Sequence, residues 1–357
     1  MRQRTDLLRS SVTLRHGTLA FGASAIGALL TVVVVDVVNA DPAQELRPLI
    51  VQAGAPVGGD GTSERPLPSI QLGLNLARPG QTVFVNAGTY HESLQSVRSG
   101  RRNAPIRLIG DRASIVGDSG TKHLIDIRHG HLEIRGFDLS SASTVIAIKR
   151  GTGVRIVRNR IHGAQRECVR LRYLSVGNEI AFNRISGCGY EGFNLFANRR
   201  NGEGIYVGTA PAQLDRNPTD VPDRSNANWI HHNRITAPAE CVEIKEDARD
   251  NIVSYNRCTG SLDPDGAGFS SRGRGTVFRG NESIRNLGSG IRLGGDHDDN
   301  DGIDSVVTGN HLRHNGQVGL KIIRWPQRRI CGNQVTGNRH GPINHDAIDP
   351  TRRCPRT

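Results

Sequence analysis

Lysine is rare in this chain, and one lysine stands in a setting that suits proton transfer. The sequence holds 46 lysine and arginine residues, of which only Lys122, Lys149, Lys245 and Lys321 are lysines. Lys245 closes the segment ECVEIK, and Arg272 closes a similar segment, GFSSR, one repeat later. An amine can lose its proton, whereas a guanidinium stays charged. We therefore expect Lys245 to act as a general base with a pKa lowered by Arg272. The alternative is an ion pair between Lys245 and a nearby glutamate.

Other charged residues recur at similar positions around the same apolar residues. Glutamates lie two positions before an apolar residue at Glu167, Glu191, Glu203 and Glu240. Cations follow apolar residues of the same repeating frame. They lie one position later as Arg170, Arg292 and Lys321, and three positions later as Lys149, Arg172, Lys245 and Arg272. Glu243 also lies one position after. Like charges on neighbouring strands repel unless something compensates them. The pattern predicts ion pairs with these cations or a bound Ca²⁺. A random scatter of surface charge is the alternative.

The elements that must position these residues are short strands that recur along the chain. An asparagine returns in an apolar frame such as NEIAFNRI, at Asn159, Asn183, Asn233, Asn256, Asn281, Asn310 and Asn333. The gaps are 24, 50, 23, 25, 29 and 23 residues, so the gap of 50 is two turns or one turn with an insertion. Repeats of this size with strand-sized pieces indicate a solenoid. We predict an all-β fold, a single-stranded right-handed parallel β-helix whose inward asparagines stack into a ladder.

A second frame places the charged residues on one surface of this helix. It reads GFNLF, CVEIK, GFSSR, GIRLG and GLKII. Side chains alternate between the two faces of a strand. We expect one inward column of apolar residues, formed by Ile146, Val169, Val242, Phe269, Ile291 and Leu320. The cations and carboxylates then line an outward groove.

The ends of the chain differ from the repeats. Residues 1–40 combine four arginines with an apolar stretch and small residues, which is typical of an export signal, with an uncleaved anchor as the alternative. Residues 41–82 contain apolar residues at helical spacing between Leu67 and Ala77, which predicts an N-terminal capping helix. We assign the β-helix to residues 83–338 and a tail to 339–357. The proline-rich stretch 209–228 is expected to be a loop outside the coils.

The cysteines agree with export. Six cysteines at positions 168, 188, 241, 258, 331 and 354 favour disulfides, and pairing in sequence order would span 20, 17 and 23 residues, close to one turn each. Their connectivity stays open at this point, as does the alternative of buried free thiols. None of the cysteines shows the CxxC spacing of a zinc site.

The charge of the chain suggests an anionic partner. The net charge is +12, and removing residues 1–40, with four arginines against two aspartates, leaves +10. A basic field attracts polyanions, although a genome that favours arginine codons would give the same composition. Nucleic acid is not expected as the partner, because the sequence offers no stacking platform or recognition motif. For an exported β-helix we expect an acidic polysaccharide.

The asparagine ladder and the opening segments PGQTVFVNAGTYHE, APIRLIGD and LEIRGFDL together resemble the pectate-lyase-like superfamily, over about residues 58–338. More narrowly, ECVEIK and the GFSSR segment one turn later resemble polysaccharide lyase family six, which contains alginate lyases and chondroitinase B. That resemblance implies that Glu240 binds calcium, with Glu203 or Glu243 nearby, that Lys245 is the base and that Arg272 is the acid. The chain departs from the family where Gly273 and Arg274 replace the histidine and glycine after the arginine, and where residues 261–266 lengthen the turn.

The resemblance implies β-elimination on a uronic-acid polysaccharide. From the N-terminal segment and the cysteines we expect a secreted or periplasmic protein, and we expect it to be a monomer. Flanking sugars would be held by the substrate-binding residues Arg170, Arg172, Arg292, Lys321 and Tyr206. Three alternatives stay open: a C5-epimerase, a glycoside hydrolase using Asp263 and Asp265, and a non-catalytic glycan-binding protein.

Overall fold

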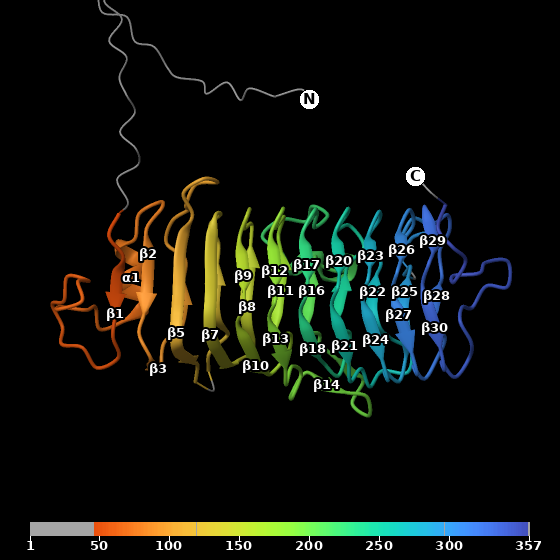
Figure 1. Cartoon of the computed structure of the whole chain (residues 1–357), viewed down its shortest axis with the longest axis horizontal. Helices are drawn as coiled ribbons and strands as arrows, with labels where there is room; N and C mark the ends of the chain where they lie inside the picture. Colours follow the sequence, from red (N-terminus) through yellow and green to blue (C-terminus); the bar gives the residue numbers. More distant parts are fainter. Residues whose placement is uncertain (1–45, 119, 296, 356–357) are drawn as a thin grey trace, which may run out of the picture. The chain divides into compact units, whose positions relative to one another are not determined.

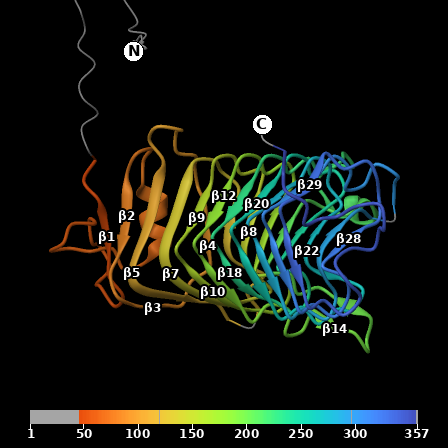
Figure 2. The same ribbon diagram turned by 45° about the vertical axis from the view of Figure 1, so that its right-hand side comes forward.

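The computed structural model describes residues 46–118, 120–295 and 297–355, and residues 46–355 form a compact unit of their own. The expected export segment, residues 1–40, lies outside the described residues. Nearly all regular structure is β-strand, arranged as coils stacked along one axis, as Figures 1 and 2 show. Within the described ranges, no helix is both long and apolar enough to span a membrane.

Each coil contributes strands to three faces, and the strands of neighbouring coils pair in parallel. The first face contains β1(Leu49–Val51), β2(Thr82–Val85), β9(Arg155–Val157), β12(Glu179–Ala181), β17(Trp229–His231), β20(Ile252–Ser254), β23(Val277–Arg279), β26(Val306–Thr308) and β29(Arg329–Cys331). The second contains β3(Gly88–Tyr90), β10(Arg160–Ala164), β13(Arg184–Ser186), β18(Arg234–Thr236), β21(Arg257–Thr259), β24(Glu282–Ile284), β27(His311–Arg313) and β30(Gln334–Thr336). Two long strands, β5(Ile106–Val116) and β7(Leu132–Ala142), run across both faces and join them into one sheet of 19 strands.

The third face is a separate sheet of nine strands. It consists of β4(Leu94–Gln95), β6(His123–Ile127), β8(Thr144–Lys149), β11(Val169–Arg172), β16(Ile205–Val207), β19(Val242–Ile244), β22(Ala267–Ser271), β25(Ser289–Leu293) and β28(Leu320–Ile322). The expected inward column is confirmed, because its six residues are fully buried and in register. Ile205 of β16 completes the column between Val169 and Val242.

The asparagine ladder is confirmed and runs without a break from Asn159 to Asn333. From Asn183 onward, the side-chain oxygen of each asparagine accepts hydrogen bonds from the backbone N–H and the side-chain amide of the asparagine one coil earlier, as between Asn183 and Asn233 at 2.9 and 3.0 Å. Because buried amides must be hydrogen-bonded, the ladder keeps a polar turn inside an apolar solenoid. Two shorter ladders were not predicted: Asn178, Asn228 and Asn251, and Asn286, Asn315 and Asn338.

The gap of 50 residues is one turn with insertions. Asn183 bonds Asn233 directly, and β13 pairs with β18. The prediction that GFNLF is a strand of the third face is wrong, because its first residues form β14(Phe193–Asn194), which pairs antiparallel with β15(Arg199–Arg200) outside the coils. The strand in that place is β16, which continues the parallel register.

The proline-rich stretch leaves the coils, as expected, and contains the short 3₁₀ helix η1(Pro211–Arg216). Asp223, which is buried, fixes its end by accepting hydrogen bonds from the backbone N–H groups of Tyr173 and Leu174 at 2.9 Å each and from the Thr209 hydroxyl at 2.6 Å. The insertion is therefore tied to the coil before it.

The helix expected between Leu67 and Ala77 is present as α1(Ile70–Leu76), with Ser69 as its N-cap. Its Gln71 side chain donates to the carbonyl of Gln95 and accepts from the N–H of the same residue at 3.1 and 2.8 Å. Gln95 belongs to β4, the first strand of the third face, so the helix satisfies part of that open edge. Its role as a cap is still a prediction.

The six cysteines form three disulfides in sequence order, Cys168–Cys188, Cys241–Cys258 and Cys331–Cys354. The first two connect neighbouring coils. The second lies beside the groove, because Cys241 stands between Glu240 and β19.

Candidate active site

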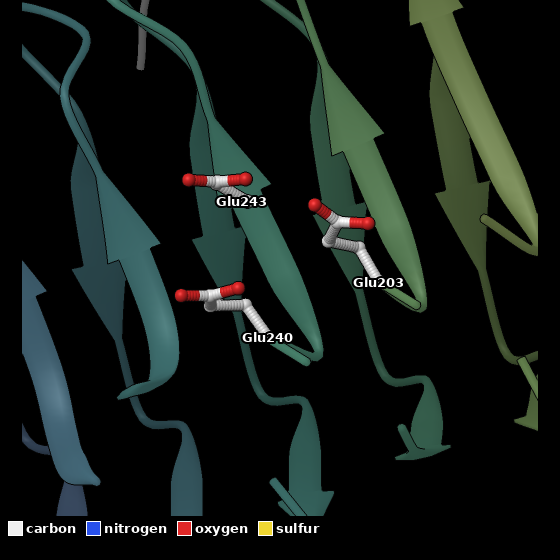
Figure 3. A group of neighbouring side chains, drawn as sticks. All are labelled: Glu203, Glu240 and Glu243. Atoms are coloured by element: carbon white, nitrogen blue, oxygen red, sulfur yellow. The ribbon is translucent and has the colours of Figure 1, made fainter. Parts of the chain in front are cut away.

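Three glutamates meet at the centre of the third face. Glu203 lies just before β16, and Glu240 and Glu243 lie before and within β19, so the three residues come from two neighbouring coils, as Figure 3 shows. One carboxylate oxygen from each lies within 4.8 Å of the others. Only 4 % of Glu203, 9 % of Glu240 and 3 % of Glu243 is exposed. Three buried carboxylates at this distance repel strongly unless cations compensate them.

Two cations stand beside this triad. The Lys245 amine is 2.7 Å from a Glu243 oxygen, and Arg272 Nε is 3.6 Å from the same oxygen. Arg272 also reaches Glu246 at 3.3 Å. Lys245 is only 7 % exposed and lies 5.0 Å from the centre of the Tyr206 ring. The fold therefore brings together the residues that the sequence analysis expected to be catalytic and metal-binding.

The charges of the triad are unequal. Burial, followed by the nearby Glu243 carboxylate, raises the pKa of Glu240 to about 7. Burial, with Glu243 next in weight, also holds the pKa of Glu203 well above its ordinary value. For Glu243, burial raises the pKa, but Lys245 and Arg272 outweigh it, so that the pKa falls below the ordinary value. Glu243 is the carboxylate that stays ionised.

The pKa of Lys245 differs from the expectation. Burial and Arg272 act to lower the pKa, as predicted for Arg272, but the Glu243 carboxylate at 2.7 Å outweighs both and raises the pKa above its ordinary value. The ion pair that the sequence left as the alternative is therefore present. Lys245 is a charged amine in this structure and needs a change of partner before it can accept a proton.

A pocket of about 180 Å³ opens over these side chains. Besides the triad, Lys245 and Arg272, it is lined by Tyr206, Arg292 and Asp263. Asp263 was expected in a loop, and the structure pairs it with Arg200 of β15 at 2.6 Å. The inserted hairpin therefore reaches the rim of the pocket, which no sequence pattern indicated.

The predicted substrate-binding residues form a column along the same face. The pairing of neighbouring strands places Arg170, Tyr206, Glu243, Ser270, Arg292 and Lys321 in register. Arg170 lies over the Tyr206 ring at 4.7 Å and pairs with the buried Glu167 at 3.2 Å. Glu191 is the exception to the predicted glutamate row, because it is exposed in the inserted segment, away from the column.

A second pocket, of about 550 Å³, continues the groove toward the N-terminal coils. Its lining is mainly cationic: Lys122, Arg128, Lys149, Arg150, Arg166, Arg170, Arg172 and Arg216, with His123 and Glu167. Arg172, the remaining predicted binding residue, lies here and not at the triad. A groove with this lining attracts polyanions.

The triad suits a hard divalent cation. Its donors are all carboxylate oxygens, the ligands that Ca²⁺ and Mg²⁺ prefer. Space is left beside them, because Gly266 faces Glu240 and a Cβ on that glycine would lie 3.0 Å from a Glu240 oxygen. The site also carries more carboxylates than Lys245 and Arg272 neutralise. Glu203, Glu240 and Glu243 would be the ligands.

The sequence matches no family model and no curated protein, but solved structures share its fold. An alginate lyase from Paenibacillus sp. str. FPU-7 superposes with a TM-score of 0.64 at 21 % identity, covering 77 % of this chain and 94 % of that chain. Pectate lyase Pel9A superposes with a TM-score of 0.52 at 12 % identity, covering 85 % of this chain and 78 % of that chain. ORF18 of Geobacillus virus E2 superposes with a TM-score of 0.58 at 13 % identity, covering 83 % of this chain and 59 % of that chain. At these identities the likeness shows the fold alone, which is the parallel β-helix that the resemblance to the pectate-lyase-like superfamily implied.

Proposed function

We propose that this chain is a polysaccharide lyase that cleaves a uronic-acid polymer by β-elimination assisted by Ca²⁺. The observation that carries the proposal is the convergence of Glu203, Glu240 and Glu243 with Lys245 and Arg272 in one pocket. The cationic groove beside that pocket supports an acidic polymer as the substrate. The β-helix fold agrees with this proposal but does not establish an activity.

Each residue has a distinct role in the proposed reaction. Ca²⁺ on the three glutamates would neutralise the substrate carboxylate and so favour loss of the proton beside it. Lys245 takes the proton from C5, the electron pair forms the C4=C5 double bond, and the bond from C4 to the leaving oxygen breaks. Arg272, whose pKa is raised because Glu243 and Glu246 outweigh its burial, keeps its charge and donates a hydrogen bond to that oxygen. The oxygen takes a proton from water and leaves as a hydroxyl group, and Lys245 returns its proton to the solvent.

Lys245 must exchange its partner for this step to occur. Glu243 holds the amine protonated in the structure, and Arg272 is the second cation within reach of the same oxygen. We propose that substrate entry draws Glu243 toward Arg272 and releases Lys245. Arg170, Arg292 and Lys321 on the neighbouring strands, and Arg172 in the adjoining pocket, would pair with the carboxylates of flanking sugars.

A substrate screen tests the proposal. The purified protein is incubated with alginate, pectate, and chondroitin or dermatan sulfate, with Ca²⁺ or a chelator. A lyase produces unsaturated uronic ends that absorb in the ultraviolet, and this absorbance should appear with one polymer only when Ca²⁺ is present. New reducing ends without absorbance would indicate a hydrolase, and exchange at C5 without cleavage an epimerase. Binding without any of these products would leave a glycan-binding protein.

A further inference from the structure

A second charged surface lies on the other sheet of the solenoid. Arg160, Arg184, Arg234 and Arg257 each follow a ladder asparagine, and strand pairing places the four in register on β10, β13, β18 and β21. All four are exposed. They belong to the second face, whereas the catalytic pocket lies on the third face. We refer to these four residues as the arginine column.

The middle of this column lacks compensation. At its ends, Arg160 pairs with Asp138 at 3.2 Å and Arg257 with Glu282 at 2.5 Å. Arg184 and Arg234 have no ion-pair partner among residues 46–118, 120–295 and 297–355. Like charges directly opposite on neighbouring strands destabilise a sheet. An anion that binds to such a row from outside the chain would reduce the repulsion between its arginines.

The first face shows the ordinary solution to the same problem. There, Arg155 stands in register between Glu133 and Glu179 and pairs with both at 2.7 Å. Charges of opposite sign alternate from coil to coil, so no external partner is needed. The absence of such alternation in the arginine column is therefore a local property of the second face and does not result from the geometry of the solenoid.

An aromatic stack holds the corner beside the column in place. Phe182, His232 and Tyr255 each precede a ladder asparagine in the left-handed backbone conformation, with φ of 58°, 55° and 56°. The His232 ring stacks on Phe182 at 4.8 Å and on Tyr255 at 5.1 Å. Arg158 covers the outer side of Phe182 at 5.1 Å, and the Tyr255 ring lies against Gly280. The ring faces that meet in the stack are therefore occupied, while Phe182 and Tyr255 stay 44 % and 53 % exposed.

We propose that the arginine column binds an acidic polysaccharide laid along the solenoid axis, at a surface separate from the catalytic groove. Parallel coils repeat at about 4.8 Å, so the column offers one guanidinium for each step of that length, comparable to one sugar unit. Guanidinium groups pair with carboxylates through two parallel hydrogen bonds. This surface would keep the protein bound to its polymer while the catalytic groove releases one segment of the polysaccharide and binds the next.

An acidic polysaccharide fits this surface better than a nucleic acid. Proteins that bind single strands without sequence preference stack bases on open aromatic faces, whereas here the rings of Phe182, His232 and Tyr255 stack on one another. Three disulfides also agree with an oxidising compartment. The polymer class rests on the proposed function, but the surface and its charge do not.

Binding to immobilised alginate and pectate tests this inference. The double variant Arg184→Gln/Arg234→Gln is compared with Arg279→Gln/Arg285→Gln, which removes the same charge from exposed positions outside the column. All proteins carry Lys245→Ala so that the probe is not consumed. We expect the column variant to bind roughly tenfold more weakly and with less dependence on salt, while the control binds like the parent. Thermal unfolding checks that both variants fold.

Equal binding of the column variant and its parent would overturn the inference, as would tighter binding of single-stranded DNA than of either polymer to the column. The outcome is separable from that of the proposed function. Loss of binding in the column variant, with no polymer cleaved by the wild-type protein, would leave the surface standing and remove the lyase. Cleavage of a polymer by the wild-type protein, with unchanged binding by the column variant, would support the lyase and remove the binding surface.

Discussion

At the scale of single residues, the account depends on three glutamates that are too close together for three negative charges. Burial and mutual repulsion raise the pKa of Glu203 and Glu240, whereas Lys245 and Arg272 keep Glu243 ionised. A divalent cation would compensate this repulsion more fully than the two side chains do. The metal-free protein should therefore carry an energetic cost at this site, and two measurements follow from that.

The first is stabilisation by calcium. Added Ca²⁺ should raise the thermal unfolding midpoint by several degrees, because a ligand that binds the folded state at 100 times its Kd adds about 2.7 kcal/mol. Glu203→Gln should remove most of this shift. Glu191→Gln serves as the matched control, since Glu191 is exposed outside the triad, and should respond like the wild-type protein. An equal shift in Glu203→Gln would place the cation elsewhere.

The second is the pH dependence of the metal-free protein. The pKa of Glu240 is about 7 in the folded state against an ordinary value of 4.5. A carboxyl with a raised folded pKa contributes stability that is complete below pH 4.5 and is lost as the pH rises through 7. Glu240→Gln should flatten this slope and, above pH 7, stabilise the metal-free protein by on the order of 2 kcal/mol. Denaturant unfolding in chelator measures it.

Bound Ca²⁺ should reverse the direction in which stability changes with pH. Protons and the cation compete for Glu240, so Ca²⁺ affinity should weaken as the pH falls below 7. A Ca²⁺-induced shift in unfolding midpoint that is constant between pH 5 and 8 would contradict the assignment of Glu240 as a ligand.

At the scale of elements, the ladder sets the position of each coil. Asn256 donates to the carbonyl of Ile230 at 2.9 Å and to Asn281 at 3.1 Å, and its oxygen accepts from Asn233. Asn256→Ala leaves several buried groups unpaired, so we expect a loss of about 2–4 kcal/mol in unfolding free energy. Gln334→Ala, at an exposed position of β30, should change it by under about 0.5 kcal/mol. Chemical denaturation compares the two, and similar losses would contradict a structural ladder.

The same elements show what the sequence could predict. An asparagine that returns inside an apolar frame has to point inward and find amide partners, so the ladder and the register of the third face followed from the spacing. The gap between Asn183 and Asn233 was different, because GFNLF and GIYVG both fit the strand pattern. Only pairing with the neighbouring coils separates β16 from the hairpin β14–β15.

The candidate site was predicted to a similar extent. The alternation within ECVEIK placed Glu243 and Lys245 on one surface, and the structure confirms that they meet. The direction of the Lys245 pKa shift was not predictable, since it depends on a contact of 2.7 Å between two side chains. The pairing of Asp263 with Arg200 joins residues 63 positions apart through an insertion, and no periodic pattern contains that information.

At the scale of the whole molecule, the described unit has one long groove and one separate arginine column. The pocket at the triad opens beside a larger cationic pocket on the same face. A polymer bound along this face would pass the cationic pocket and place one carboxylate at the glutamates. The disulfide Cys241–Cys258 ties the coil of the triad to the next coil, which favours a rigid groove over a closing one.

The most direct test of the central claim is the ultraviolet absorbance of unsaturated uronic products, recorded for the wild-type protein and for Lys245→Ala on the same polymer with Ca²⁺. Loss of a general base lowers a rate by roughly 10²–10⁴-fold, so the variant should be silent, whereas Arg329→Ala, which removes a cation from an exposed position of β29 on the first face, should keep most of its turnover rate. The account also predicts that Lys245→Ala still gains thermal stability from Ca²⁺. Product formation by Lys245→Ala at the wild-type rate would contradict it.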